Sequence, residues 1–414
     1  MKGIISPTLK LPNFRKLYFA GATSELGSFV TETVLMLFVF KLTNQDKSYL
    51  GILRATFLVF LTLGGILGGP IGNAFNRKKV LIFCEFARIP LLICLLFFHN
   101  VGIVIACDAV IAFFTGIFRP SRQALLNEIV PQDKIKKANG FFASTNAVLH
   151  LVGPLLGASL FGFFQGINEV LILDLATYGL GLFLLSRISY APSKDSFSGG
   201  ESFLAEISSG FGYLKKRRDL FAINLNAISA GFAIGILIPL LVPFTLEVLE
   251  RTERDYGILM TFFGLGGLFG SWATEKASEL FPNGKIPYIT VILETIVFFL
   301  FINNRSFIIA TVILFFWGLL VFLRITSQMN FISDSVETKY LTRVHAMLEM
   351  SFIVPNISGG LLIALLGNDF KTVQLLQGAS ILFLLFIILR IPFPHMRALW
   401  SVRPEGVTRE VQID

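Results

Sequence analysis

The chain has 414 residues, of which 54% are hydrophobic and only 15% are charged, and its formal net charge is +8. Soluble domains carry roughly 25% charged residues, so this composition excludes an ordinary soluble enzyme and favours a protein embedded in lipid. The apolar residues also come in runs of about twenty, long enough to cross a hydrocarbon layer of about 30 Å.

We therefore predict an all-α membrane protein with twelve transmembrane helices. The first sixteen residues lack the apolar core and cleavage site of a secretory signal, so the first run is expected to be an uncleaved anchor. The twelve runs are 17–40, 48–74, 80–98, 101–126, 138–165, 169–188, 220–249, 255–280, 286–302, 306–331, 343–366 and 372–392.

One long connection divides these runs into six and six. It begins with a Ser- and Gly-rich loop and continues with Phe203, Ile207, Phe211 and Leu214 at helical spacing, which predicts an amphipathic surface helix. The predicted domains are a six-helix bundle (1–189), a cytoplasmic linker (190–219), a second six-helix bundle (220–392) and a cytoplasmic tail (393–414).

The Lys and Arg residues gather on alternate connections. Under the positive-inside rule this places both termini in the cytoplasm of a bacterial inner membrane. The same asymmetry accounts for the positive net charge, so nucleic-acid binding is not needed to explain it. The basic clusters are also not interleaved with aromatic residues, as they are in many nucleic-acid-binding surfaces.

Two acidic residues lie inside the first run. Glu25 and Glu32 are seven residues apart, about two helical turns, so they share one stripe with Ser28 between them. A charge in hydrocarbon costs at least ~2.5 kcal/mol, so this stripe is expected to face a polar path and to be a site of proton exchange. A hydrogen bond that packs the helices is the structural alternative.

Other ionisable residues within the runs are candidates for proton coupling or substrate binding. Arg54 could neutralise a carboxylate of the first run, and Glu85 and Arg88, at i and i+3, predict a local ion pair. In the second half Glu294 is the most isolated charge. The full set of coupling or substrate candidates is Glu25, Glu32, Arg54, Asp108, His150, Asp174 and Glu294.

The two halves of the chain resemble each other faintly. Arg119 and Gln123 match Arg324 and Gln328 at an offset of 205, and Gly153 matches a glycine 206 positions later. Two homologous six-helix halves with a site between them at mid-membrane are a known carrier design.

Three local motifs resemble those of the major facilitator superfamily. The segment GGPIGNAFNRKKVLI keeps Gly69-Pro70 and a basic cluster, but Asn73 and Ala74 replace the usual Asp-Arg pair, which weakens the expected cytoplasmic latch. LHLVGPLLGASL resembles the Gly-Pro motif of antiporters, and RPSRQALLNEIVP followed by KKANGFF resembles the macrolide-efflux and enterobactin-exporter branch. Lysophospholipid transporters are similar there too.

The resemblance implies two pseudo-symmetric six-helix bundles that rock around a central cavity. It also implies a gating or conformational role for residues on the matching positions and their repeats. These residues are Gly69, Asn73, Arg77, Lys78, Arg119, Gly153, Pro154 and Arg324.

The predicted function is secondary transport, with export of an amphipathic drug or siderophore-like molecule in exchange for protons. No phosphate-binding GxxxxGK[ST] loop is present, so ATP is not expected to drive it directly. Cys84, Cys94 and Cys107 form no CxxC pair, and neither a metal nor a cofactor is expected. We expect a monomer in contact with membrane lipid.

Three alternatives stay open at this point. The nearest is a lipid or lysophospholipid translocase of the same fold, which could work without a proton gradient. A membrane-embedded enzyme would need a clustered nucleophile and base, whereas the four histidines are scattered without a shared motif. A transport-dead sensor is the third.

Overall fold

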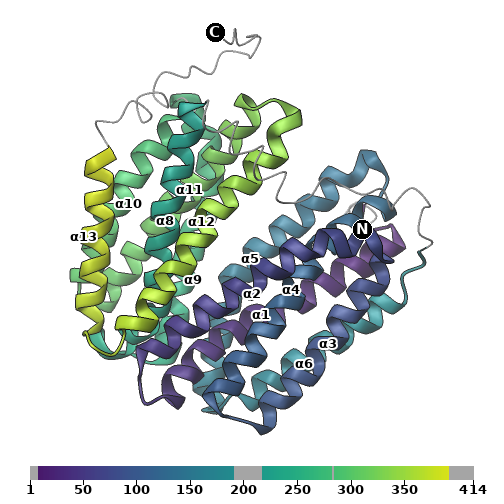
Figure 1. Ribbon diagram of the computed structural model, residues 1–414, viewed down its shortest axis with the longest axis horizontal. Coiled ribbons are helices and arrows are strands. Elements are labelled where there is room, and N and C mark those ends of the chain that lie inside the picture. The colour runs from purple at the N-terminus through teal and green to yellow at the C-terminus, as the bar shows by residue number, and fades with distance from the viewer. Residues whose placement is uncertain (1–7, 191–216, 282–283, 391–414) are drawn as a thin grey trace, which may run out of the picture. The chain divides into compact units, whose positions relative to one another are not determined.

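The computed structural model describes residues 8–190, 217–281 and 284–390. Across these ranges the chain consists of long helices joined by short turns, without a β-strand (Figure 1). The predicted surface helix through Phe203, Ile207, Phe211 and Leu214 and the predicted tail 393–414 lie outside the described residues.

The helices up to residue 186 are drawn from purple to blue in Figure 1. Asp46, Asn76 and Asn100 cap the second, third and fourth of them, each accepting a backbone N–H two or three residues later. The helices are α1 (Pro12–Leu42), α2 (Lys47–Ala74), α3 (Arg77–Phe97), α4 (Val101–Ile129), α5 (Gln132–Phe164) and α6 (Asn168–Ser186).

The later helices run from teal to yellow. Prolines 239 and 243 fall in the first of them, and the α-helical hydrogen bonding there gives way to one π-helical stretch, because proline has no N–H to donate. The elements are α8 (Arg218–Pro243), η2 (Phe244–Val248), α9 (Glu253–Leu280), α10 (Lys285–Asn303), α11 (Phe307–Ser335), α12 (Thr338–Leu366) and α13 (Thr372–Arg390).

Eleven of the described helical stretches are long and apolar enough to cross a membrane. The sequence predicts twelve, and the helix outside the eleven is α1. α1 carries Glu25 and Glu32 within its apolar stretch, so its composition is mixed although its length of 31 residues is ample. The multi-pass, all-α membrane fold predicted from the sequence is confirmed.

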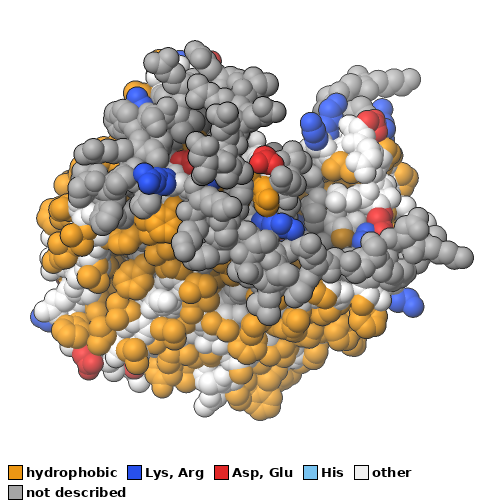
Figure 2. Space-filling view, turned by 45° about the horizontal axis from the view of Figure 1, so that its top comes forward, with side chains coloured by type: hydrophobic (Ala, Val, Ile, Leu, Met, Phe, Trp, Pro, Cys, Tyr) orange, Lys and Arg blue, Asp and Glu red, His pale blue; other side chains and the backbone are white. Residues whose placement is uncertain are grey.

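Large apolar side chains cover the outside of these helices. Phe163, Trp272 and Leu365 are each at least 76% exposed, and hydrophobic side chains spread over much of the face in Figure 2. An exposed apolar surface that extends over many helices is typical of a protein that contacts lipid.

The contacts divide the chain into two compact units. The first unit comprises residues 1–200, 238–261 and 360–370, and the second unit comprises 201–237, 262–359 and 371–414. Within the first unit α1 packs on α5 and α6, α2 on α4, and α3 on α4 and α6. Within the second unit α10 packs on α11 and α13. The domain boundaries predicted at 189 and 219 stay a prediction.

Both units contain close helix crossings built from glycines, and one of these crossings recurs in both. A Cβ on Gly64 would lie 2.0 Å from the carbonyl oxygen of Phe113, and one on Gly116 would lie 2.2 Å from that of Leu61. α2 and α4 can therefore touch backbone to backbone, as small residues allow in membrane helices.

The second unit repeats this crossing between α9 and α11. A Cβ on Gly266 would lie 1.8 Å from the oxygen of Phe315, and one on Gly318 would lie 1.9 Å from that of Phe263. All four positions follow their counterparts by 202 residues, which supports the internal repeat predicted from the sequence.

The bounds of the same helices repeat at a larger offset. α9 and α11 begin and end 206 residues after α2 and α4. A Cβ on Gly270 would also lie 2.2 Å from the carbonyl oxygen of Leu319, so the crossing of Gly64 with Phe113 recurs at 206 as well as at 202. The match of Arg119 with Arg324 at 205 stays a prediction.

Candidate functional site

A small cavity lies inside the first unit, lined mainly by side chains of α1, α4 and α6. Its volume of about 50 Å³ has room for roughly three to five water molecules. Pockets for whole drug-sized molecules have about 300–1,000 Å³. The lining residues are Ser24, Glu25, Ser28, Phe29, Thr31, Glu32, Phe57, Arg88, Asp108, Ile111, Thr115, Phe118, Arg119, Asp174 and Tyr178.

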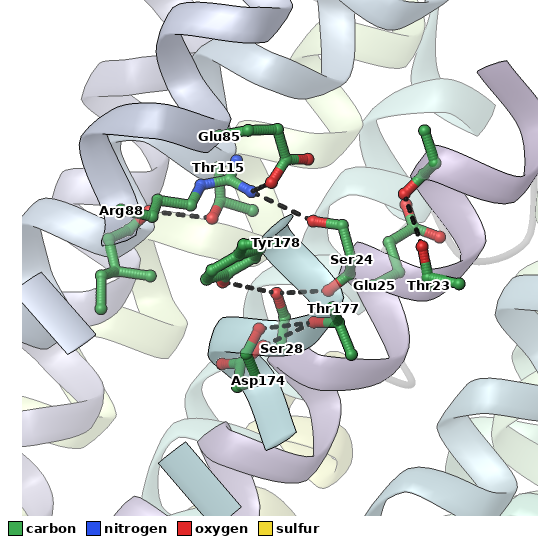
Figure 3. A network of polar contacts seen from close by, with 12 residues as sticks. Thr23, Ser24, Glu25, Ser28, Glu85, Arg88, Thr115, Asp174, Thr177 and Tyr178 are labelled. Carbon is green, nitrogen blue, oxygen red and sulfur yellow. Dashed lines mark hydrogen bonds and ion pairs between the residues drawn. The ribbon is translucent and has the colours of Figure 1, made fainter. Parts of the chain in front are cut away.

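α1 presents a polar face to this cavity and to α6. Ser28 and Tyr178 share a hydrogen bond of 3.1 Å between their hydroxyls, and Thr31 donates to Asp174 at 2.7 Å (Figure 3 shows the first of these). Thr177 donates to the same carboxylate at 3.1 Å. A Cβ on Gly27 would lie 2.0 Å from Asp174, so glycine lets this carboxylate reach α1. Asp174 is thus a hydrogen-bonded link between α1 and α6.

The predicted pair within α3 forms next to this link. Arg88 and Glu85 approach to 3.7 Å, and their side chains are at most 2% exposed. The guanidinium also contacts Ser24 at 3.4 Å and lies 5.3 Å from the ring of Tyr178 (Figure 3). It lies 5.1 Å from the ring of Phe118. The i, i+3 prediction for this pair is confirmed.

The two acids of α1 each bind an arginine from another helix. Glu32 pairs with Arg54 of α2 at 2.8 Å, which confirms that Arg54 neutralises a carboxylate of the first helix. Glu25 pairs with Arg122 of α4 at 2.6 Å. Arg122 also stacks over the ring of Phe142 at 4.5 Å, so this arginine is held on two sides.

Asp108 of α4 completes the acidic set without an arginine of its own. It is 6% exposed, and it has no hydrogen bond or ion pair with any other described residue. It lines the cavity and an adjoining space of about 10 Å³ that it shares with Glu32 and Arg54. Leu35, Met36, Leu53 and Phe57 form the rest of that space, so two carboxylates face one guanidinium among apolar side chains.

Arg119 lies three turns further along α4 and lines the cavity with its side chain exposed. Within the described part of the chain its guanidinium makes no hydrogen bond and no ion pair. His150 of α5 is stacked on Phe29 with ring centroids 4.3 Å apart, and it lies within electrostatic range of Glu32, Arg119 and Glu25. The structure thus brings His150 next to the same cavity.

The basic motif after α2 acts inside the first unit. Arg77 binds Glu128 at the end of α4 and donates to the carbonyl oxygen of Ala124 at 3.4 Å. Glu128 also accepts a hydrogen bond from Tyr190. Burial and this bond to Glu128 raise the pKa of Tyr190 to about 12. Arg77 therefore joins the start of α3 to the end of α4.

Three further side chains hold the end of α6. Lys78 donates to the carbonyl oxygens of Ser186 and Ile188 at 2.8 and 2.7 Å. Lys16 of α1 donates to that of Arg187 at 2.5 Å, and Asn13 exchanges two hydrogen bonds with Ser189. These contacts satisfy carbonyls that the helix end leaves unpaired.

The remaining motif residues have packing roles of different strength. A Cβ on Gly153 would lie 2.6 Å from that of Phe29, so this glycine lets α5 approach α1, and Pro154 is buried beside it. A Cβ on Gly69 would meet nothing within 4 Å. Asn73 lies in the last turn of α2. Their predicted part in gating stays a prediction.

An embedded ion pair also lies among the described residues of the second unit. Glu294 of α10 binds Arg324 of α11 at 2.7 Å, and the two side chains are 3% and 2% exposed. The prediction that Glu294 is isolated is wrong, because α10 and α11 pack directly and bring the arginine to it.

An apolar cavity of about 410 Å³ also lies in the second unit, among α8, α12 and α13. Two serines are its polar contribution, and four phenylalanine or leucine side chains dominate its wall. The lining residues are Ile228, Ser229, Phe232, Ala233, Val354, Pro355, Ser358, Ala379, Leu382, Phe383 and Phe386.

Sequence reasoning missed Arg122, Glu128 and Tyr178 as parts of these networks. Arg122 stands in the same RPSRQ motif as Arg119, and its helical position was the available signal. Tyr178 lies in a run of apolar residues and carries no charge to reveal it. Among the described residues no group of three or more His, Cys, Asp or Glu is placed to hold a metal ion.

Comparison with known proteins places these helices in a family. The family model described as Major Facilitator Superfamily matches residues 17–359. The "uncharacterized MFS-type transporter YfmI" of Bacillus subtilis is 26% identical over 360 residues, covering 82% of this chain and 86% of that protein. Macrolide efflux protein A of Streptococcus pyogenes is 23% identical over 362 residues, covering 82% and 86%.

Two solved structures share the fold at low identity. The nucleoside transporter NupG superposes with a TM-score of 0.73 at 11% identity, covering 94% of this chain and 99% of that one. A bacterial homologue of the human lysosomal transporter Spinster, facing inward and unoccupied, gives 0.71 at 14%, covering 93% and 97%. The membrane helices, the glycine crossings and these matches agree, and the chain belongs to the Major Facilitator Superfamily as a transporter rather than an enzyme.

Proposed function

We propose that this transporter is a proton-coupled exporter of an amphipathic small molecule and that it works by alternating access. The charge imbalance around Arg54 is the observation that carries this proposal, because Glu32 and Asp108 share one guanidinium. An unpaired carboxylate in an apolar space is costly, so one of the two acids is favoured to take up a proton.

The other embedded acids support the same assignment by contrast. Glu25, Glu85 and Glu294 each have an arginine within 4 Å, and Asp174 accepts two hydroxyl hydrogen bonds. An arginine or two hydroxyl donors thus stabilise each of these carboxylates, whereas Asp108 has no such partner among the described residues. The coupling role predicted for Glu25 or Glu32 is thus assigned to Glu32 and Asp108.

Export is supported by the relatives. One is called a macrolide efflux protein, and a macrolide is a large amphipathic molecule. We propose that the protein lies in a bacterial inner membrane with both termini in the cytoplasm and acts as a monomer. The motif residues named above would serve the conformational change.

The test is uptake of labelled macrolides, cationic dyes, catechol siderophores and lysophospholipids into inverted vesicles, with and without a proton gradient. Asp108→Asn should abolish gradient-driven uptake but keep gradient-independent exchange of the same substrate. Asp133→Asn, at the exposed start of α5, is the matched control and should behave as wild type. Full gradient-driven uptake by Asp108→Asn and by the Glu25→Gln/Glu32→Gln double variant would contradict proton coupling through these acids.

A lipid or lysophospholipid translocase is the second candidate. The apolar cavity of about 410 Å³ in the second unit favours it, because such a wall suits acyl chains. Movement of lysophospholipid alone, at the same rate with and without the gradient, would establish this function in place of proton-coupled export.

A further inference from the structure

Four arginines of the first unit lie in its membrane helices away from the helix starts, and one of them differs from the rest. Arg54, Arg88 and Arg122 each lie within 4 Å of a glutamate. Arg119 lines the cavity and has no carboxylate, hydroxyl or carbonyl partner among the described residues. Among the described residues this lining thus holds one acid without a partner, Asp108, and one cation without a partner, Arg119, and Arg119 is the group able to receive an anion.

A guanidinium in this position needs acceptors from outside the protein. It has five N–H donors in a planar fork, and a charge within a membrane protein is stable only when it is paired or hydrated. Water can satisfy its donors when the cavity is empty, but water does not neutralise its charge. A carboxylate or phosphate does both, through two parallel hydrogen bonds.

The surroundings of Arg119 suit the rest of such a molecule. The rings of Phe29 and Phe118 line the same cavity, and His150 is stacked on Phe29. A volume of about 50 Å³ admits one small group rather than a whole drug-sized molecule. The fitting ligand thus places an anionic head in the cavity and leaves its apolar body outside it.

We infer that Arg119 binds the anionic group, carboxylate or phosphate, of an amphipathic substrate. This inference rests on the proposed transport function and narrows its substrate class. It separates this chain from a carrier of cationic drugs, whose positive charge Arg119 would repel.

Arg119 and Asp108 line the same cavity, but they lie at different levels of α4. Asp108 precedes Arg119 by eleven residues on α4, which at 1.5 Å per residue is roughly 16 Å along the helix axis. At that separation an anion on Arg119 does not need to displace a proton from Asp108. The two sites can therefore be tested independently.

The test is equilibrium dialysis of the purified full-length protein in detergent, without a gradient, using three probes with one apolar body. The probes are 2-naphthoate, 2-naphthyl phosphate and the cation 2-naphthylmethylamine. Arg119→Gln should weaken binding of the anions about tenfold, the loss expected for a charge-assisted hydrogen bond. Arg119→Lys should recover most of it, and Arg187→Gln, at the exposed end of α6, should match wild type.

A second measurement needs no variant. Phenylglyoxal modifies accessible arginines, and peptide mapping by mass spectrometry reports each one separately. Saturating 2-naphthoate should slow modification of Arg119 and leave that of Arg187 unchanged. This readout applies even if Arg119→Gln does not fold.

The outcomes separate the two anion sources and the two proposals. If Arg119→Gln weakens the binding of 2-naphthyl phosphate alone, the site selects a phosphate headgroup. If it weakens the binding of both anions, the site accepts anions in general. Equal anion binding by wild type and Arg119→Gln without protection from phenylglyoxal would overturn the inference, as would tighter binding of the amine. Asp108→Asn removes a negative charge from the same lining and should therefore not weaken anion binding, so loss of gradient-driven uptake with undiminished anion binding concerns proton coupling only.

Discussion

In the second unit Glu294 and Arg324 bind each other at 2.7 Å and are at most 3% exposed. In the first unit Arg122 and Glu25 also pair, at 2.6 Å, but Asp108 and Arg119 form no ion pair with any described residue. A closed ion pair among packed helices holds structure, whereas a charge without a partner next to a cavity is available to a proton or a ligand. We therefore expect the Glu294–Arg324 pair to be structural and Asp108 and Arg119 to be functional.

Breaking the closed pair should give the largest effect. Arg324→Leu leaves the Glu294 carboxylate buried and unpaired, which is expected to lower the free energy of unfolding by about 3–5 kcal/mol. The measurement is the midpoint of denaturant unfolding in detergent. The double variant Glu294→Leu/Arg324→Leu should recover most of the loss, and an unchanged midpoint in Arg324→Leu would show that the pair is not needed for stability.

The repeated glycine crossings should respond equally in the two units. Gly116→Ala and Gly318→Ala place a Cβ 2.2 and 1.9 Å from a carbonyl oxygen, and each should cost about 1–3 kcal/mol through overpacking. Thermal unfolding of the two variants measures this. Gly179→Ala and Gly378→Ala, where a Cβ meets nothing within 4 Å, are the controls and should be neutral or stabilising. A large cost at one crossing only would contradict the shared register.

Removing the unpaired carboxylate of Asp108 should stabilise the protein rather than destabilise it. Asp108→Asn deletes a charge that has no partner among the described residues, so it should raise the free energy of unfolding by about 1 kcal/mol, as is common when a functional charge is removed. The same denaturant midpoint measures it, and Glu32→Gln is a useful companion because it removes an acid that Arg54 binds. Marked destabilisation by Asp108→Asn would instead make this carboxylate structural.

The smallest effect concerns the cytoplasmic motif. Tyr190→Phe removes one partly exposed hydrogen bond to Glu128, with an expected cost of about 0.5–1.5 kcal/mol. The pKa of Tyr190 is raised to about 12 in the folded protein, so its contribution is complete below pH 10 and is lost as the pH rises from about 10 to about 12. Unfolding midpoints of wild type and Tyr190→Phe should converge over that range, and parallel curves would rule out this bond as their cause.

Much of the first unit follows from spacing along single helices. The helix count, the common stripe of Glu25 and Glu32 and the pair of Glu85 with Arg88 all depend on helical periodicity, which sequence displays directly. Arg54 was also predicted to neutralise a carboxylate of the first helix, and the structure shows that this carboxylate is Glu32.

Contacts between distant helices could not be predicted in this way. Glu25 meets Arg122 across 97 positions, and Glu294 meets Arg324 across 30, so both pairs depend on which helix faces pack together. The glycines at the helix crossings were an unused signal, since Gly64 and Gly116 of the first unit recur as Gly266 and Gly318 in the second.

The hydrogen bonds at the end of α6 have a mechanical consequence. Asn13, Lys16 and Lys78 hold the backbone of residues 186–189, and Tyr190 is fastened to Glu128 of α4. A pull on the chain beyond Tyr190 would act on α1, α3 and α4 as well as on α6. Because four helices share the load, such a pull should not unravel α6 by itself.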